Sequence, residues 1–285
     1  TIFNDLSYHF QKNKTTVFLG SNGIGKSTLL KTIAGFEKPL IGSVQINENL
    51  VHEMSPMDRA QCMSVVLTER KLSGDLLGIE VIRLGRQPYT NWIGSQAKED
   101  DQLVSKIIAQ LNIGQLAEQT LKTMSDGEIQ KILLGRALAQ DTTIVLLDEP
   151  SSHLDLYNKA LLFQQIKQRV KEDQKTILFT SHDLNTAIQI CDKIILLVGI
   201  QVVFVDLVLW KKGNWCPHIF KSIKQRAQIE VLDANAHVAC IFCADNTIPQ
   251  DLGRRNVCGV SGKFSWVCNE VTICRHLHSI WIFLL

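Results

Sequence analysis

The sequence has no apolar stretch of the length that a membrane-spanning helix requires, which is about 20 residues. Its longest mostly apolar run, residues 194–210, is interrupted by Gln201 and Asp206, and we expect buried β-strand there. The first residues lack the basic head, the apolar centre and the small-residue cleavage site of a secretory signal. We therefore expect neither a membrane span in this run nor export by a cleaved signal.

Neither sign of charge is in excess. The 30 lysine and arginine residues against 28 aspartate and glutamate residues leave a formal net charge of +2. No basic stretch is long enough to hold DNA or RNA by the release of counterions, so we expect no nucleic acid as a partner. With 45% hydrophobic and 20% charged residues, the composition is that of a globular protein and excludes a disordered or fibrous one.

Cysteine is scarce in the first 199 residues, where only Cys62 and Cys191 occur. This scarcity favours a reducing compartment, the cytosol. Residues 200–285 differ, because they hold four of the five tryptophans and six of the eight cysteines, namely Cys216, Cys240, Cys243, Cys258, Cys268 and Cys274. The change in composition predicts a boundary near residue 199.

Short runs of apolar and β-branched residues predict strands at residues 15–19, 144–147 and 176–180. Helical segments such as residues 159–171 separate these runs, which is typical of parallel strands with helical crossovers. Residues of about 75–140 carry apolar positions three and four apart and predict a helical insertion. The sequence therefore predicts a doubly wound α/β fold that contains an α-helical subdomain.

A glycine-rich segment with the sequence GSNGIGKST lies between the first predicted strand and a helix. It matches the phosphate-binding loop G-x-x-x-x-G-K-[ST], in which glycines let backbone N–H groups turn toward phosphates. Lys26 would reach the β- and γ-phosphates, and the Ser27 hydroxyl would bind Mg²⁺. We prefer this interpretation to a structural glycine turn and predict a nucleotide site at Gly20, Ser21, Asn22, Gly23, Ile24, Gly25, Lys26, Ser27 and Thr28.

Two carboxylates follow the predicted strand at residues 144–147. Asp148 would hold Mg²⁺ through water, and Glu149 would polarise the attacking water. Such a pair alone would be interpreted as solvated carboxylates at the end of a strand. A site that hydrolyses a nucleotide, however, needs both a carboxylate for the metal and a base for the water. Together with the phosphate loop, the pair predicts hydrolysis of a nucleotide.

Ser125 begins a further predicted helix. Glu128 stands three residues later and completes a capping box, the pattern of a helix N-terminus. The free N–H groups at such an end can bind a phosphate.

Five motifs in this order, GSNGIGKST, SDGE, IVLLDEP, SSHLD and TSHD, resemble the nucleotide-binding subunit of an ABC transporter. The resemblance covers about residues 1–198 and implies a P-loop NTPase (RecA-like) core. Residues 81–92, VIRLGRQPYTNW, further resemble the importer subclass that takes up iron–siderophore complexes, haem and vitamin B12. The resemblance therefore implies an ATPase that energises such uptake, with ATP and Mg²⁺ as cofactors.

The same resemblance implies partners and further site residues. Two such subunits would pack head to tail, with ATP between the phosphate loop of one and Ser125 and Gly127 of the other. His182 would contact the γ-phosphate, and Asp155 would lie in the loop that couples the two sites. The subunit would sit at the cytoplasmic face of the cell membrane against permease subunits, which an external substrate-binding protein serves.

The chain departs from the family pattern at its nucleotide site. Thr68, or else Glu69, stands where the family usually has a glutamine that senses Mg²⁺ and the transmembrane partner. We therefore expect Thr68 near the metal and an altered coupling. The aromatic residue that stacks on adenine would lie upstream of Thr1, so the chain looks truncated at its N-terminus.

The resemblance stops near Val198, and residues 199–285 form an atypical tail. Cys240, Cys243, Cys268 and Cys274, with His276 and His278, suggest a zinc site, but their spacing fits no common zinc finger. A shifted reading frame explains the composition of the tail better. We therefore expect the tail to be disordered or out of frame, and the nucleotide core to need nothing after about Val205.

Two other functions stay open at this stage. One is a non-transport ABC ATPase acting on DNA or ribosomes, although such proteins generally need long coiled coils or two cassettes in one chain. The other is an inactive, truncated cassette.

Overall fold

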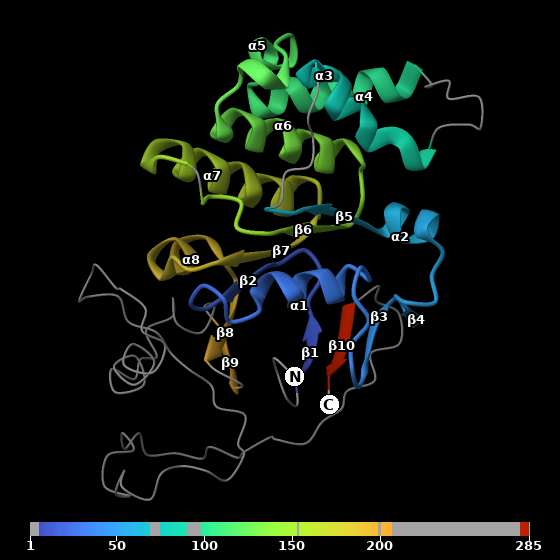
Figure 1. Cartoon of the computed structure of the whole chain (residues 1–285), viewed down its shortest axis with the longest axis vertical. Coiled ribbons are helices and arrows are strands. Elements are labelled where there is room, and N and C mark those ends of the chain that lie inside the picture. Colours follow the sequence, from blue (N-terminus) through green and yellow to red (C-terminus); the bar gives the residue numbers. More distant parts are fainter. Residues whose placement is uncertain are drawn as a thin grey trace, which may run out of the picture.

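The main sheet of the protein has six strands, and the predicted strands form its centre (Figure 1). The computed structural model describes residues 6–68, 75–89, 98–152, 154–198, 201–206 and 280–284. The strands of the main sheet lie in the order β5 (Met63–Val66), β6 (Ile144–Leu147), β7 (Thr176–Ser181), β2 (Thr15–Leu19), β8 (Lys193–Val198) and β9 (Gln201–Asp206).

The pairing confirms the predicted α/β fold. All neighbours in the main sheet are parallel except β9, which is antiparallel to β8. The run at residues 194–210, where we expected β-strand, contributes to two strands, which pair antiparallel with Val198 opposite Gln201. The polar Gln201 and Asp206 stand at the two ends of β9.

Helices cover both faces of the main sheet (Figure 1). Those of the predicted insertion lie between β5 and β6 in the chain and form one end of the molecule. The helices are α1 (Lys26–Ile33), α2 (Pro56–Cys62), α3 (Gly78–Arg83), α4 (Lys98–Leu111), α5 (Gly114–Ala117), α6 (Asp126–Ala139), α7 (Leu156–Glu172) and α8 (Leu184–Ile190), with 3-10 turns η1 (Leu84–Tyr89) and η2 (Leu121–Thr123).

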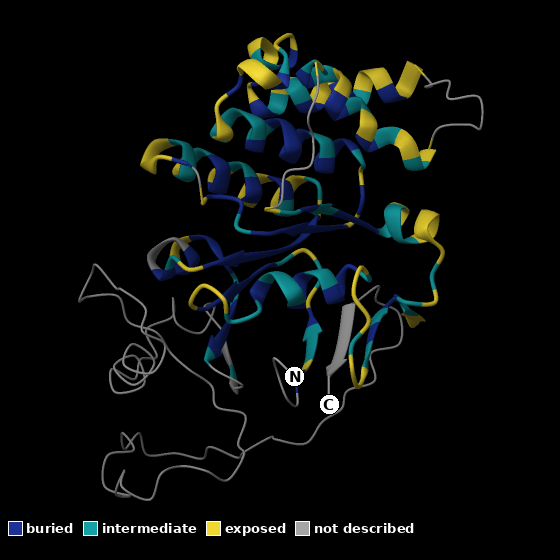
Figure 2. Cartoon of the chain, in the orientation of Figure 1, coloured by how far each residue is buried: buried dark blue, intermediate teal, exposed yellow. Residues whose placement is uncertain are grey.

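The central strands are buried on both faces (Figure 2). Along β2, Phe18 packs into the cluster that contains α1, whereas Val17 and Leu19 belong to the cluster that contains α6, α7 and α8. Burying one such side chain contributes about 1.5–3 kcal/mol. Burial on both faces explains why these strands are runs of mostly apolar and β-branched residues and why their positions could be predicted.

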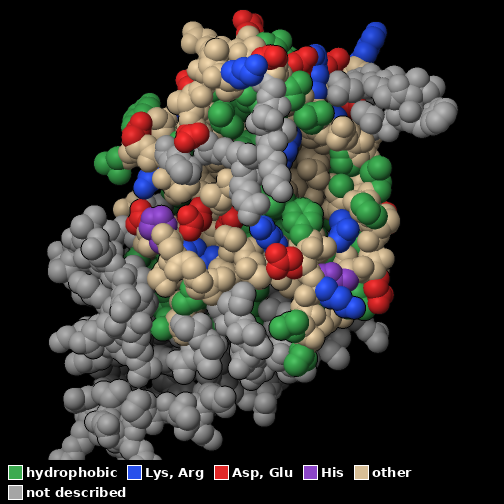
Figure 3. Space-filling view, in the orientation of Figure 1, with side chains coloured by type: hydrophobic (Ala, Val, Ile, Leu, Met, Phe, Trp, Pro, Cys, Tyr) green, Lys and Arg blue, Asp and Glu red, His purple; other side chains and the backbone are tan. Residues whose placement is uncertain are grey.

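Charged side chains of both signs are interspersed on the face drawn in Figure 3, and hydrophobic side chains lie between them in small groups. None of the described helices is both long and apolar enough to cross a lipid bilayer.

The second sheet corrects the prediction for the tail. It has four strands in the order β1 (Leu6–Phe10), β10 (Ile280–Leu284), β3 (Ser43–Ile46) and β4 (Asn49–Leu50), with antiparallel neighbours. The expectation of a disordered tail does not hold for β10, which pairs with strands on both sides. That the nucleotide core needs nothing after about Val205 stays a prediction. The sequence of β10, IWIFL, is a short continuous apolar run, a pattern that is also typical of strands.

A proline in β10 is expected to destabilise the protein. Ile282 pairs with Tyr8 on one side and Val44 on the other, and proline has no N–H to donate in a central strand. Ile282→Pro should cost about 1–3 kcal/mol, the range for an unsatisfied buried group, and lower Tm by about 3–10 °C. Calorimetry measures the Tm of this variant, with Ile282→Val, which keeps the backbone N–H, as the control. Equal melting temperatures of the two variants would show that β10 is not part of the sheet.

Candidate functional site

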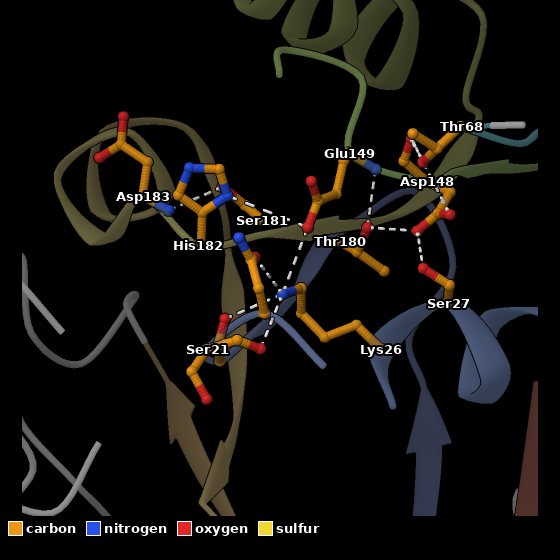
Figure 4. A network of polar contacts seen from close by, with 12 residues as sticks. Ser21, Lys26, Ser27, Thr68, Asp148, Glu149, Thr180, Ser181, His182 and Asp183 are labelled. Atoms are coloured by element: carbon orange, nitrogen blue, oxygen red, sulfur yellow. Dashed lines mark hydrogen bonds and ion pairs between the residues drawn. The ribbon is translucent and has the colours of Figure 1, made fainter. Parts of the chain in front are cut away.

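The ends of three adjacent strands bring the predicted nucleotide residues together. The strands β6, β7 and β2 are parallel neighbours, so their carboxyl ends meet at one edge of the sheet. There the chain continues into the phosphate loop after β2, into Asp148 and Glu149 after β6, and into His182 after β7 (Figure 4). This is the edge at which open α/β sheets bind ligands.

The phosphate loop has the backbone that glycine permits. Gly25 is the N-cap residue of α1 with φ 102°, and Gly23 has φ 79°, both in the left-handed region that side chains disfavour. The side chain of Ile24 packs against the apolar cluster beneath. The first turn of α1 carries no acidic residue, so its N–H groups face no competing negative charge from that turn.

A cleft of about 330 Å³ opens over this loop. Its lining residues are Asn22, Gly23, Gly25, Lys26, Ser27, Thr28, Thr68 and Glu149. The structure thus brings most of the residues predicted from the phosphate loop into one cleft with the residue predicted as the base.

Lys26 is held at the floor of this cleft. Its side chain is 4% exposed, and Nζ donates to the carbonyl oxygens of Gly20 at 2.9 Å and Ser21 at 3.1 Å. Asn22 Oδ1 accepts a third bond at 3.5 Å. Glu149 Oε1 lies 3.3 Å from the same nitrogen and forms an ion pair with it (Figure 4). A phosphate entering the cleft would compete with these oxygens for the ammonium group.

Glu149 and His182 approach each other from two strands. His182 Nδ1 is 3.9 Å from Glu149 Oε1, and the imidazole is half exposed. The backbone of Glu149 is in the left-handed region, with φ 44°, which is uncommon for a residue other than glycine. Its N–H donates to Thr180 Oγ1 at 2.7 Å, and this bond stabilises the unusual conformation.

Asp148 lies beneath these groups and is 3% exposed. Ser27 Oγ at 2.9 Å and Thr180 Oγ1 at 2.8 Å both donate to its Oδ1. Thr68 Oγ1 donates to Oδ2 at 2.8 Å. Carboxylate and hydroxyl oxygens are ligands that Mg²⁺ prefers, usually together with water and phosphate oxygens. The donors present therefore fit Mg²⁺ held with a nucleotide, whereas no group of three His, Cys, Asp or Glu residues in the described part of the chain could hold a metal alone.

Thr180 is a site residue that the sequence analysis missed. It lies inside the TSHD motif, is fully buried, and joins the side chain of Asp148 to the backbone of Glu149. In the parallel register Leu147 pairs with Phe179, so the residues that follow them stand side by side. The sequence does show a threonine at the end of this strand. Its place beside Asp148 could be inferred only once the pairing of β6 with β7 was known.

Ser125, Gly127 and Asp155 line a separate cleft. Its volume is also about 330 Å³, and its lining residues are Ser125, Asp126, Gly127, Glu128, Lys131, Leu154, Asp155 and Asn158. It shares no lining residue with the cleft at the phosphate loop. Within one chain, the structure therefore does not bring these three residues to the phosphate loop.

Helix caps build the second cleft. The predicted capping box at Ser125 is confirmed, because Ser125 Oγ accepts from Glu128 N at 3.4 Å and Glu128 Oε2 accepts from Ser125 N at 2.8 Å. Hydrogen bonds from the Ser125 hydroxyl and N–H lower the pKa of Glu128. Asp155 caps α7 by accepting from Asn158 N at 2.8 Å, and bonds from Asn158 lower the pKa of Asp155. Both carboxylates thus stay charged at helix starts.

Several predicted residues lie outside the described part of the chain. These are Glu69, residues 90–92 of the importer-like segment, and the zinc candidates Cys240, Cys243, Cys268, Cys274, His276 and His278.

The chain is similar to known proteins in its sequence and in its fold. The family model described as ABC transporter matches residues 3–152. An uncharacterized ABC transporter ATP-binding protein of Methanocaldococcus jannaschii is 37% identical over 71% of this chain and 70% of its own length. The achromobactin transport ATP-binding protein of Dickeya dadantii is 34% identical over 68% of this chain and 72% of its own.

Among solved structures, a chain of a transporter assigned to the metal-chelate type, in an inward-facing conformation, is similar with a TM-score of 0.65. It is 25% identical, and the match covers 77% of this chain and 82% of that one.

Proposed function

The chain belongs to the ABC transporter ATP-binding family, and from this membership we propose that it hydrolyses ATP to energise the uptake of an iron–siderophore complex, haem or a corrinoid. Its work as a transport ATPase follows from the family. The class of cargo is supported by the achromobactin transport relative and by the similarity to a transporter of the metal-chelate type.

The single observation that carries the mechanism is the presence of two incomplete clefts on one chain. The first has a phosphate loop, a carboxylate base and hydroxyl oxygens, but lacks the Ser125 helix start. The second has the helix start at Ser125 with Gly127 and Asp155, but lacks a phosphate loop. Two copies packed head to tail would complete both clefts, each with one ATP between the copies. In this antiparallel arrangement each copy contributes the same two surfaces, so the interface is isologous and the assembly closes at two subunits.

Within each completed cleft, the residues would have distinct roles. The backbone of residues 20–28 and Lys26 would bind the phosphates, and the N–H groups at the start of α6 would bind them from the other copy. Glu149 would accept the proton of the attacking water, and His182 would contact the γ-phosphate. Ser27 and Asp148 would hold Mg²⁺, which when bound neutralises phosphate charge.

The partners follow from the same proposal. ATP binding would close the dimer, closure would act on permease subunits in the membrane, and hydrolysis would reset it. The chain would work at the cytoplasmic face of that membrane, with an external substrate-binding protein supplying the cargo. Asp155, at the start of α7, would couple the two clefts.

ATP hydrolysis by the purified chain tests the proposal. We expect release of phosphate that depends on Mg²⁺. The rate per chain should rise with protein concentration, because a larger fraction of the chains then forms dimers. A folded chain that binds no ATP and releases no phosphate would instead favour the inactive cassette.

Arginine at position 125 is expected to separate binding from hydrolysis. Because Ser125 lies in the cleft without the phosphate loop, Ser125→Arg should bind ATP at its own loop with parental affinity. Its bulk and charge should prevent the second copy from closing, so hydrolysis should fall to background. Fluorescence titration and phosphate release measure the two effects, with Ser105→Arg, at an exposed position of α4, as the control. Loss of ATP binding would place Ser125 in the pocket of its own chain.

A further inference from the structure

We propose that Thr68 is a positioning residue that orients Asp148 toward Mg²⁺ and acts on the metal through that carboxylate. This inference rests on the proposed nucleotide site. Thr68 follows β5, and its side chain lines the cleft at the phosphate loop. Its Oγ1 is 2.8 Å from Asp148 Oδ2 and 3.1 Å from the Asp148 carbonyl oxygen.

The hydroxyl hydrogen of Thr68 is donated to the carboxylate of Asp148 and not to its carbonyl oxygen. A threonine hydroxyl has one hydrogen to donate, and a charged acceptor at the shorter distance forms the stronger bond. The Asp148 N–H donates in turn to the Val66 carbonyl at 2.8 Å, so the backbone of Asp148 is already fixed to this segment. The hydroxyl of Thr68 thus adds a restraint on the side chain of Asp148.

The hydrogen bonds at Asp148 are unevenly distributed between its oxygens. Oδ1 accepts from Ser27 and Thr180, which uses both of its lone pairs. Among the described residues, only Thr68 donates to Oδ2, which leaves one lone pair for a metal or a metal-bound water. The oxygen with remaining capacity is therefore the one that Thr68 orients. Without this hydroxyl, the carboxylate would keep two donors on Oδ1 and lose the restraint on Oδ2.

Binding of Mn²⁺ to the ADP complex, followed by electron paramagnetic resonance, tests this role. Thr68→Val keeps the shape of the side chain and removes the hydroxyl, whereas Thr68→Ser keeps the hydroxyl. We expect Thr68→Val to weaken Mn²⁺ binding about 10–100-fold, the usual effect of losing a hydrogen bond to a metal ligand. Thr68→Ser should restore it to within about threefold of the parent, and ADP binding measured in EDTA should not change.

Thr142→Val is the matched control, because Thr142 is buried and donates to the Ile144 carbonyl, outside the cleft. It should bind Mn²⁺ like the parent. If Thr68→Val does not fold, Thr68→Ala removes the same hydroxyl and takes its place.

Parental Mn²⁺ affinity in a folded Thr68→Val or Thr68→Ala chain would overturn the proposal, and so would equal weakening in Thr68→Ser. Failure of the nucleotide site itself is distinguishable, since then the parent would bind no ADP in EDTA.

Discussion

Replacing Glu149 with glutamine is expected to lower ATP turnover by about 100-fold or more, the range lost with a general base. Glutamine keeps the size of the side chain but cannot accept the proton of the attacking water. The ion pair between Glu149 and Lys26 would also be lost, so nucleotide should bind at least as tightly as in the parent. Steady-state phosphate release and an ADP titration measure the two effects.

Glu118→Gln is the control for this variant, because Glu118 is exposed at the end of α5 and lines neither cleft. It should hydrolyse ATP at the parental rate. Parental turnover in Glu149→Gln would show that another group is the base.

Replacing Lys26 with alanine is expected to weaken nucleotide binding by about 10–100-fold. The loss corresponds to removing hydrogen bonds to a charged group, about 1.5–3 kcal/mol. Among the described residues that line the cleft at the phosphate loop, Lys26 is the only lysine or arginine. Without it, the negative charge of the phosphates would meet backbone N–H groups and Mg²⁺ alone. Equilibrium titration with a fluorescent ATP analogue measures the affinity.

Lys31→Ala on the same helix is the matched control, since Lys31 is outside the lining of the cleft. Circular dichroism confirms that each variant is folded. If Lys26→Ala and Lys31→Ala both keep the parental affinity, the phosphate loop is not the binding site.

Local patterns of the sequence were sufficient for the strands at the centre of the fold. The residues of β2, β6 and β7 are mostly apolar or β-branched because both faces of the sheet are covered, and such runs stand out between glycine and charged residues. The phosphate loop could also be predicted, since its glycines and Lys26 are fixed in spacing by the shape of a bound phosphate.

Features that depend on strand pairing could not be predicted. The position of Thr180 beside Asp148 follows from the register of β6 and β7, which no local pattern specifies. The pairing of β10 joins it to β1, 270–278 positions earlier in the chain, and to β3, 234–240 positions earlier. The apolar run of β10 alone indicated neither partner. The resemblance implied that Ser125 and Gly127 act on the nucleotide of the other copy, and the fold places them in a cleft that shares no lining residue with the cleft of Lys26.

ATP hydrolysis by a mixture of Lys26→Ala and Ser125→Arg chains tests the central claim most directly, namely that each site is shared between two copies. At an ATP concentration near the parental Kd, each variant alone should be nearly inactive, because every dimer would lack either the lysine or an open helix start in both sites. A mixed dimer has one intact site, made from the phosphate loop of the Ser125→Arg chain and Ser125 of the other. With random pairing, we predict a rate that clearly exceeds that of either variant alone and approaches about a quarter of the parental one. A mixture as inactive as its separate components would contradict the shared site.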